Sequence, residues 1–569
     1  MLQLVRSSPH DLHEYRWAIN IIDQYLAVSC PPNMMMSLTG LTIGNKHSSE
    51  ELSAYVNSSN NIFRLFFECV KDKIIEAENV RYYLFSLVVL DQLGAAVTLA
   101  QEIKKRRPQA IIVFGGPLIS RFHTRFADMP WLKDVADIIA PGEAYEVLSR
   151  ILGIQHTWTR HVTPDFSDFD LAKYFSPRLV LPYLVAHGCA WGKCFFCTHH
   201  LTYPRYRSSE MKEVIGDIHT LIEKYNVDHI SFSDEYLSAK QLSEMVDLLE
   251  ERRLDIKWST FVRAESRFAD DQFMNKLYHG GARLLMFGFE SASQRILNLM
   301  KKGTSVARYA PILKSCRKAG IATRIDFMLG FPSETIDEVR RTFSFIKENS
   351  HLIDTPFSSL TIAVFELRED APIMNDLGRH GIRTKALLRG DLDEQYDFIS
   401  DSGCSNRQKQ ALRHRMIAYA KNDLKSELIC PRNKTHQLVL KDMYDEGCFD
   451  LPVTTVSVAE MENLWGRWNE GVEIVTERSC IRVSSYVSGG EVEMSPHLKI
   501  LVEALKDRKS LYSVLLRQKE LEMRAFVKVL NFLYRNEYIR IDIGKKHLEK
   551  NSSCKVIYSK ADHELCAVG

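Results

Sequence analysis

Short apolar runs alternate with amphipathic stretches from about residue 80 onward. YYLFSLVVL (82–90), AIIVFGGP (110–117) and the start of VADIIAPGEAYEVL (135–148) predict buried strands, and helical spacing follows, as over 94–105. This alternation is typical of a parallel sheet with crossover helices. Residues 1–75 predict mostly helical and irregular structure. We therefore expect an upstream α/β unit within residues 1–155.

Two turns follow the strands of this upstream unit. One contains Gly115, Gly116 and Pro117, and the other contains Gly142 and Glu143. Open α/β sheets bind ligands at the carboxyl ends of their strands, and glycine there allows a ligand to approach the backbone. Tight strand-to-helix turns use the same residue types, so both interpretations stay open.

A second α/β unit follows a linker at residues 156–178, which includes TPDFSDFDLAKYFSPR. Six further strand–helix steps are predicted within residues 179–400. Their strands begin in LVLPYLVAHG (179–188), HISFSDE (229–235), IKWSTFVRAE (256–265), RLLMFGFES (283–291), IATRIDFMLGFPSET (321–335) and SSLTIAVFELRE (358–369). Polar residues at the ends of these strands predict a barrel, or part of one, with its chemistry on that face.

The alternation is lost in residues 401–569. The segment 405–430 predicts a helix, and 494–541 has a winged-helix-like order of helices and a short strand. Without a basic excess, we interpret this segment as a packing or partner-binding module rather than a DNA reader.

Composition narrows the function classes. The chain has 569 residues, 45% hydrophobic and 26% charged, with 74 basic against 72 acidic side chains and a net charge of +2. This balance argues against a nucleic-acid partner. No apolar run is long enough to span a membrane, so no membrane association is expected. Twelve cysteines without a secretory signal favour a reducing, cytoplasmic location.

Three of these cysteines carry the strongest chemical signal. Cys189, Cys194 and Cys197 lie in GCAWGKCFFC, directly after a predicted strand. Three thiolates at this spacing favour an iron–sulfur cluster that leaves one iron open for a ligand. Two alternatives stay open: a structural zinc with His199 or His200 as fourth ligand, and a disulfide with a spare thiol. A separate, auxiliary cluster is a further hypothesis, with ligands from Cys404, Cys430, Cys448 and Cys480.

With these motifs in order, the chain resembles the radical S-adenosylmethionine (SAM) enzymes, specifically those with a cobalamin-binding domain. The resemblance covers roughly residues 80–400. It rests on the GGP and GE turns, PDFSDFDLAKYFSP, GCAWGKCFFCTHH, YRSSE, SFSDE, FVRAE, FGFESASQRILNLMKKG and LGFPSETIDE. It implies an α/β fold: a partial (βα)6 TIM-type barrel, a Rossmann-like cobalamin-binding-type domain before it, and a mainly helical, winged-helix-like region after it.

The resemblance also implies roles for individual residues. Cys189, Cys194 and Cys197 would hold a 4Fe–4S cluster whose open iron is chelated by SAM. Phe196 would lie near the adenine, and Gly288, Glu290 and Ser291 would contact the ribose or amino-acid part of SAM. Arg263, Arg324 and the turn Leu329–Pro332 would line the same edge. The strand-end carboxylates Asp234, Glu235, Glu265 and Glu290 would bind SAM, fix arginines or transfer protons.

The chain departs from the family pattern in three places. The cysteine spacing is C-x4-C-x2-C, one residue longer than the common C-x3-C-x2-C, and Gly192 gives that loop conformational freedom. The strand that usually opens the cobalamin domain is not found before Tyr82, and no D-x-H-x-x-G signature occurs. Either the upstream domain has lost cobalamin and only covers the barrel, or an upstream start is missing from this chain.

The implied activity is reductive cleavage of SAM to a 5′-deoxyadenosyl radical. With cobalamin bound, we expect C-methylation of a peptide or natural-product substrate; without it, oxidation, cyclisation or epimerisation. An electron donor such as flavodoxin or ferredoxin is the expected partner. The alternative outside the family is a non-catalytic, zinc-stabilised scaffold protein.

Overall fold

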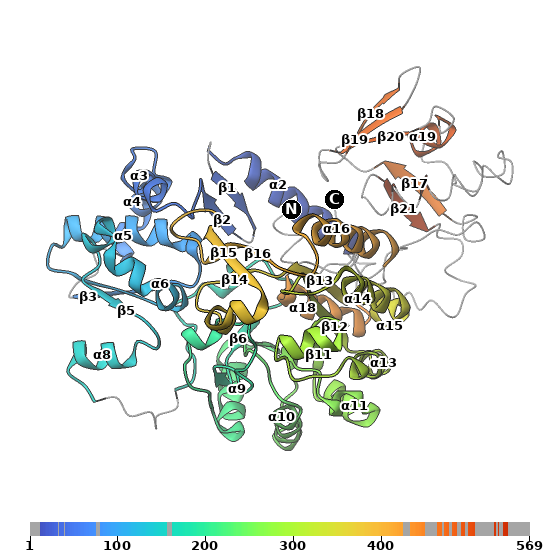
Figure 1. Ribbon diagram of the computed structural model, residues 1–569, viewed down its shortest axis with the longest axis horizontal. Helices are drawn as coiled ribbons and strands as arrows, with labels where there is room; N and C mark the ends of the chain where they lie inside the picture. The colour runs from blue at the N-terminus through green and yellow to red at the C-terminus, as the bar shows by residue number, and fades with distance from the viewer. Residues whose placement is uncertain are drawn as a thin grey trace, which may run out of the picture.

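The computed structural model shows two α/β units side by side (Figure 1). It describes residues 12–31, 34–38, 40–74, 80–155, 162–424 and 433–449, with shorter pieces at 464–468, 472–476, 481–485, 491–494, 499–506, 529–530, 533 and 539–543. Within these residues, no helix combines the length and apolar character needed to cross a membrane.

The larger unit is built on a six-stranded, fully parallel sheet in the order β13-β12-β11-β10-β9-β6. Each strand pairs with the next in sequence, as in an opened barrel, so the prediction of six successive strand–helix steps is confirmed. The strands are β6 (Val180–Tyr183), β9 (His229–Phe232), β10 (Lys257–Val262), β11 (Ala282–Glu290), β12 (Ala322–Leu329) and β13 (Ser359–Val364).

Helices cover the outer face of this sheet (Figure 1). They are α9 (Met211–Tyr225), α10 (Ala239–Glu251), α11 (Asp271–His279), α12 (Gln294–Leu299), α13 (Tyr309–Ala319), α14 (Ile336–Glu348), α15 (Ser350–Ile353) and α16 (Asn406–Asp423). Side-chain caps start them where the sequence changes from strand to helix: Ser238 with Gln241, and Thr335 with Glu338, form capping boxes. Helix α16 packs against β13 and α14, so the barrel core continues to Leu424, past residue 400.

Two distant helices fill the inner face of the barrel. Leu284 and Met286 of β11 pack with α2 (Leu12–Val28) and α18 (Lys434–Asp445). The buried carboxylate of Asp442 accepts hydrogen bonds from Arg283 Nε at 2.9 Å and lies 3.1 Å from Nε2 of His229. Paired charges of this kind avoid the cost of an isolated buried ion. The amino-terminal ends of the strands are therefore closed by α2, which precedes the upstream unit, and α18, which follows the barrel.

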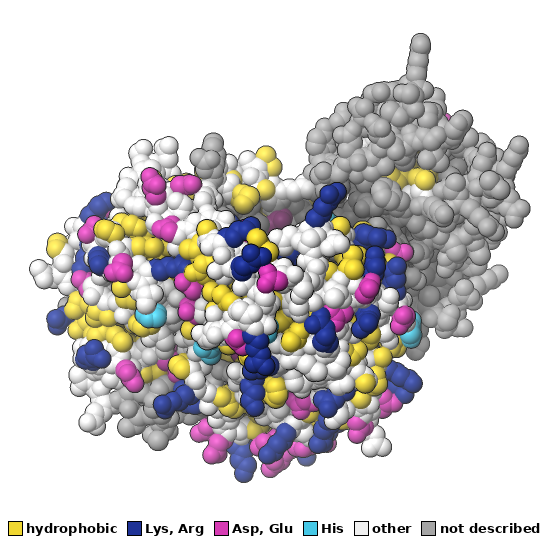
Figure 2. Space-filling view, in the orientation of Figure 1, with side chains coloured by type: hydrophobic (Ala, Val, Ile, Leu, Met, Phe, Trp, Pro, Cys, Tyr) yellow, Lys and Arg dark blue, Asp and Glu magenta, His cyan; other side chains and the backbone are white. Residues whose placement is uncertain are grey.

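The upstream unit has a three-stranded parallel sheet in the order β3-β4-β5 among the described residues. Its elements are β3 (Tyr82–Ser86), α5 (Leu93–Arg106), β4 (Ile111–Gly115), α6 (Pro117–Asp128), α7 (Pro130–Lys133), β5 (Ile138–Ala140) and α8 (Tyr145–Leu152). A hairpin, β1 (Met34–Ser37) and β2 (Gly40–Ile43), and two helices, α3 (Ser49–Asn57) and α4 (Ile62–Ile74), precede it. Figure 2 shows hydrophobic side chains gathered over this unit, where Leu84, Val88 and Val89 are exposed.

An antiparallel sheet that the sequence analysis did not anticipate joins the two units. It consists of β14 (Leu367–Arg368), β15 (Ile382–Leu387) and β16 (Gln395–Ser400), in the order β14-β16-β15. The loop between β15 and β16 carries Leu392, which is fully buried in the core of the upstream unit. Arg121 of α6 fixes the same loop through Glu394 at 2.9 Å.

The described parts of residues 450–569 include five strands, of which the sequence analysis expected only a short one at the end of the segment 494–541, where the last of them lies. They are β17 (Leu464–Trp468), β18 (Val472–Thr476), β19 (Ile481–Ser485), β20 (Glu491–Met494) and β21 (Ile539–Ile543), with one helix, α19 (Lys499–Lys506). Most of the winged-helix-like segment 494–541 lies outside the described residues.

Candidate functional site

The cysteine loop follows β6 and the short strand β7 (Ala186–His187) at the carboxyl edge of the barrel. Its entry is fixed by Asp234, whose carboxylate accepts the backbone N–H groups of Val185 at 3.1 Å and Ala186 at 2.7 Å. Burial raises the pKa of Asp234 to about 6, although these two donors act against the rise. Asp234 therefore positions the loop and does not face open space.

The thiols of Cys189, Cys194 and Cys197 are half-buried and close enough to influence one another electrostatically. Burial raises the pKa of Cys197 to about 11 and also raises that of Cys194. The backbone N–H of Gly192 points at Cys189 Sγ, 3.5 Å away. Neutral thiols in a partly dry loop become good ligands once a cation compensates the thiolate charge.

The donor set fits an iron–sulfur cluster, because a cluster takes one thiolate per iron and its three cysteines need not converge on one point. Within the described residues, no group of three or more His, Cys, Asp and Glu side chains is placed to hold a single metal ion. His199, one of the two fourth ligands considered for zinc, has its Nδ1 2.7 Å from Glu235, a contact that a zinc-bound histidine also makes.

Several contacts lock the cysteine loop to the segment after α12. The N–H of Phe195 donates to the carbonyl of Met300 at 3.0 Å, and the Trp191 indole donates to Lys301 at 2.9 Å. Arg263 stacks on Trp191, 4.4 Å from the ring centroid, and donates to the carbonyl of Lys302. The guanidinium of Arg263 thus holds two loops together.

Glu290 lies at the end of β11 in a strained backbone conformation, with φ of 63°. Its carboxylate pairs with Lys302 Nζ at 2.7 Å. Burial acts to lower the pKa of Lys302, but Glu290 and Cys194 outweigh it and the net change is upward. A side chain at Gly288 would meet this ion pair at 2.7 and 2.8 Å, so glycine makes room for it. Lys302 is a site residue that the sequence analysis did not single out.

Ser291 and Arg324 lie away from the cysteine loop's immediate contacts. Ser291 is buried, and its hydroxyl is 3.4 Å from Glu334, which also accepts the N–H of Gly330. This arrangement fixes the turn Leu329–Pro332, and burial raises the pKa of Glu334 to about 7. Arg324 pairs with Asp326 at 3.1 Å on β12.

Two of the remaining expected carboxylates have structural partners. Glu235 pairs with His199, as described above. Glu265 accepts the N–H of Ala239 at 3.4 Å, at the start of α10, and burial raises its pKa. The proton-transfer role that we considered for these groups stays a prediction.

The glycine turns of the upstream unit have different surroundings. A Cβ on Gly116, whose φ is 96°, would lie 2.6 Å from the backbone oxygen of Leu87, and one on Gly115 would lie 3.3 Å from that of Ala140. Pro117 begins α6. Gly142, in contrast, has nothing within 4 Å of its Cβ position, so this turn borders open space.

Glu143, in the same turn, contacts the barrel. It pairs with Arg207 of the short strand β8 (Arg207–Ser208) and lies 3.3 Å from Nδ1 of His187. The predicted cofactor residue is thus also a link between the two units.

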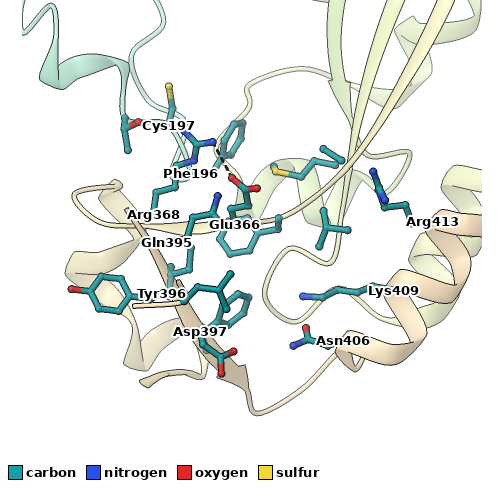
Figure 3. Close-up of a pocket in the computed structure, with 18 of the residues that line it drawn as sticks. Phe196, Cys197, Glu366, Arg368, Gln395, Tyr396, Asp397, Asn406, Lys409 and Arg413 are labelled. Atoms are coloured by element: carbon teal, nitrogen blue, oxygen red, sulfur yellow. Dashed lines mark hydrogen bonds and ion pairs between the residues drawn. The ribbon is translucent and has the colours of Figure 1, made fainter. Parts of the chain in front are cut away.

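A cavity of about 810 Å³ opens beside the cysteine loop, between β13, the antiparallel sheet and α16 (Figure 3). Phe196 and Cys197 form one end of it. Met328, Phe365, Tyr396 and Phe398 supply apolar surface, and Asn406, Lys409, Gln410 and Arg413 line it from α16. Their spacing of three and four residues was visible in the sequence, but nothing there indicated what that helix face would meet.

Two of the four cysteines considered for an auxiliary cluster are described. Cys404 lies among Glu334 and Lys409 at the carboxyl edge of the barrel, whereas Cys448 lies near Arg178 and Glu446 just after α18. Cys430 and Cys480 lie outside the described residues.

The central part of the chain matches a family of known proteins. Residues 183–346 match the family model described as the radical SAM superfamily. An uncharacterized methyltransferase from Pyrococcus horikoshii is 29% identical over 32% of this chain and 38% of its own length. The bacteriochlorophyllide d C-8(2)-methyltransferase of Chlorobaculum tepidum is 28% identical over 47% of this chain and 62% of its own length.

Two further similarities extend over more of the chain. The anaerobic magnesium-protoporphyrin IX monomethyl ester cyclase of Cereibacter sphaeroides is 23% identical over 59% of this chain and 62% of its own length. The chain thus spans less than two thirds of the length of these curated relatives. The solved structure of the radical SAM methyltransferase TsrM from Kitasatospora setae, with cobalamin and a [4Fe-4S] cluster, is 14% identical with a TM-score of 0.49, over 64% of this chain and 85% of that one.

Proposed function

We propose, from the premise that residues 183–346 make this chain a member of the radical SAM superfamily, that it cleaves SAM reductively and uses the radical to modify a small-molecule or peptide substrate. One observation carries the proposal. The thiols of Cys189, Cys194 and Cys197 lie together on a loop at the carboxyl edge of the barrel, beside a cavity large enough for a substrate.

A 4Fe–4S cluster, when bound, would supply the one-electron reduction that splits the SAM sulfonium into methionine and a 5′-deoxyadenosyl radical. Cys189, Cys194 and Cys197 would hold that cluster, and Trp191 and Arg263 fix the loop that carries these cysteines. The other residues of the site would position SAM and shield the reacting atoms from water. The Glu290–Lys302 pair presents a preorganised charge pair beside the loop, where polar parts of SAM would bind.

Phe196 offers an aromatic face next to the third cysteine, and it lines the cavity with Cys197. An aromatic ring at that position suits stacking against a base and excludes water from the reacting atoms. An external one-electron donor of the flavodoxin or ferredoxin class would supply the electron.

Cobalamin-dependent C-methylation is the reaction we propose for this site. Cobalamin, when bound, supplies a methyl carrier. Support comes from the parallel sheet upstream of the barrel, the open space at Gly142, the exposed Val88 and Val89, and relatives named as methyltransferases.

A cobalamin-free oxidation, cyclisation or epimerisation is the second candidate. The observation in its favour is Gly116, because the backbone of Leu87 already fills the space that a cofactor would need at that turn. The relative named as a cyclase supports cyclisation as a reaction type, whether or not cobalamin is bound.

Product analysis tests both candidates. The full chain is reconstituted anaerobically with iron and sulfide, supplied with SAM, hydroxocobalamin and a strong reductant, and followed by mass spectrometry. We expect 5′-deoxyadenosine with the wild type and none with Cys189→Ala. S-Adenosylhomocysteine that forms only when cobalamin is present supports methyl transfer. A protein that holds zinc but no iron and forms neither product is a scaffold, and the proposal is then wrong.

A further inference from the structure

The wall of the cavity formed by α16 carries two cations without carboxylate partners. Lys409 is only 6% exposed, yet it has no carboxylate oxygen within 4.0 Å among the described residues, and the same holds for Arg413. Figure 3 shows Lys409 extending from α16 into the cavity, with Arg413 one turn further along the helix. Arg413 is oriented by its Nε, which donates to the carbonyl of Ile362 at 2.9 Å.

The acidic groups of the cavity are committed elsewhere. Glu366 pairs with Arg368 at 2.9 Å, and Asp397 pairs with Lys385 at 2.8 Å. Among the described lining residues, the cations Arg368, Lys409 and Arg413 outnumber the carboxylates Glu366 and Asp397, and Asp397 acts on Lys409 without forming an ion pair with it. Such a charge in a partly dry site is costly unless an anion from outside meets it.

The Lys409 side chain is held in place rather than free to swing into solvent. Its stem packs on Gly330, where a Cβ would come within 2.5 Å of it, and its Nζ lies 5.2 Å from the ring centroid of Phe398. Burial lowers the pKa of Lys409, and the attraction of Cys404, Asp397 and Glu334 does not offset it. The ammonium is thus fixed at one position in the cavity.

Met328, Phe365 and Phe398 give the cavity apolar surface among its polar lining residues, and Phe196 and Cys197 form the opposite end. A volume of about 810 Å³ suits a small molecule rather than a folded partner. We propose that this cavity is the substrate site and that it takes a small molecule with a carboxylate or phosphate group, which Lys409 and Arg413 bind while its apolar part extends toward Cys197. This inference rests on the proposed function.

Binding of matched probes tests the inference. Fluorine NMR follows a fluorinated phenylpropanoate, the corresponding aryl-alkyl phosphate and the neutral amide of the first, each with the reconstituted full chain and SAM. We expect at least one anionic probe to bind about tenfold or more tightly than the amide, because a charge-assisted hydrogen bond is lost with the neutral group. The anion that binds more tightly distinguishes a carboxylate from a phosphate substrate.

Substitutions at Lys409 test whether this side chain causes the preference for the anionic probes over the amide. In Lys409→Met the preference for the anion should disappear, and in Lys409→Arg it should return. Lys421→Met is the matched control, because Lys421 lies in the last turn of the same helix and is exposed. If Lys409→Met lacks the wild-type melting temperature or iron content, Arg413→Gln carries the same comparison.

The outcomes separate this inference from the proposed function. A wild type that forms 5′-deoxyadenosine but binds the amide as tightly as the anions, or binds neither anion, overturns the substrate class alone. So does a Lys409→Met variant that keeps the preference. Anion preference in a protein without iron and without SAM cleavage overturns the proposed function alone.

Discussion

The barrel and the upstream unit both place glycines at the carboxyl ends of parallel strands, but these glycines make room for different neighbours. In the barrel, Gly288 leaves room for two polar side chains, Glu290 and Lys302, at the edge that carries the cysteine loop. In the upstream unit, Gly116 leaves room for the backbone of Leu87. A glycine at a carboxyl edge therefore indicates close approach, and only the fold reveals whether a backbone, a side chain or a ligand approaches.

The largest effect, a complete loss of activity, should come from a substitution in the barrel. We expect Cys197→Ala to lose the iron–sulfur chromophore and all SAM cleavage, because the cluster needs each thiolate. Cys69→Ala is the control, since Cys69 is an exposed thiol on α4, apart from the cysteine loop. Iron and sulfide content measure the outcome, and full iron content in Cys197→Ala would contradict the ligand assignment.

Substitution of the upstream glycines should affect stability instead. Gly116→Ala places a Cβ 2.6 Å from the backbone of Leu87 in a left-handed conformation, and we expect a loss of about 3 kcal/mol or more. Gly142→Ala meets nothing within 4 Å and should cost only about 1 kcal/mol for its positive φ. Denaturant unfolding measures both, and equal losses would remove the distinction between a filled and an open turn.

The buried carboxyl group of Glu334, at the carboxyl edge of the barrel, should make the stability of the protein depend on pH. Its pKa is raised from 4.5 to about 7 in the folded state, so the folded protein binds the extra proton and loses stability as pH rises through this window. Glu334→Gln cannot ionise, so it should gain about 2 kcal/mol relative to wild type between pH 5 and pH 8. Thermal melts across that pH range measure the gain. A difference in stability between Glu334→Gln and wild type that does not change with pH would show that Glu334 does not titrate in this window.

The smallest effect on stability should follow from Gly288→Ala. The added Cβ would displace Glu290 and Lys302, whose flexible ends can move, so we expect little change in stability. The rate of 5′-deoxyadenosine formation should fall about tenfold, because the charge pair is no longer positioned. An unchanged rate with the cluster intact would show that the pair has no part in binding SAM.

The sequence predicted the features that depend on local periodicity and missed those that depend on distant pairing. The six barrel strands follow from apolar runs, and their consecutive order is confirmed. The pairing of Asp442 with His229 and Arg283 joins residues more than a hundred positions apart, and no local pattern encodes it. The antiparallel sheet escaped prediction because β15 is largely exposed and its neighbouring loop packs into another unit.

The site residues also divide into those that a local sequence pattern reveals and those that only the fold brings together. The cysteines were evident from spacing alone, whereas Lys302 sits in NLMKKG, a stretch that is also typical of a solvated turn. Its importance became visible only when β11 brought Glu290 to within 2.7 Å. Lys409 was equally hidden, because α16 carries polar residues on several faces and the sequence does not show which face meets the cavity.

Leu392 has a consequence for how the two units communicate. The hairpin of β15 and β16 contributes Tyr396 and Phe398 to the cavity wall, and its loop is buried in the upstream core through Leu392. A ligand on either side that favours one position of this hairpin must change affinity on the other side by the same factor, since linkage is reciprocal. Leu392 therefore marks the route by which a ligand that shifts this hairpin would couple the upstream unit to the cavity.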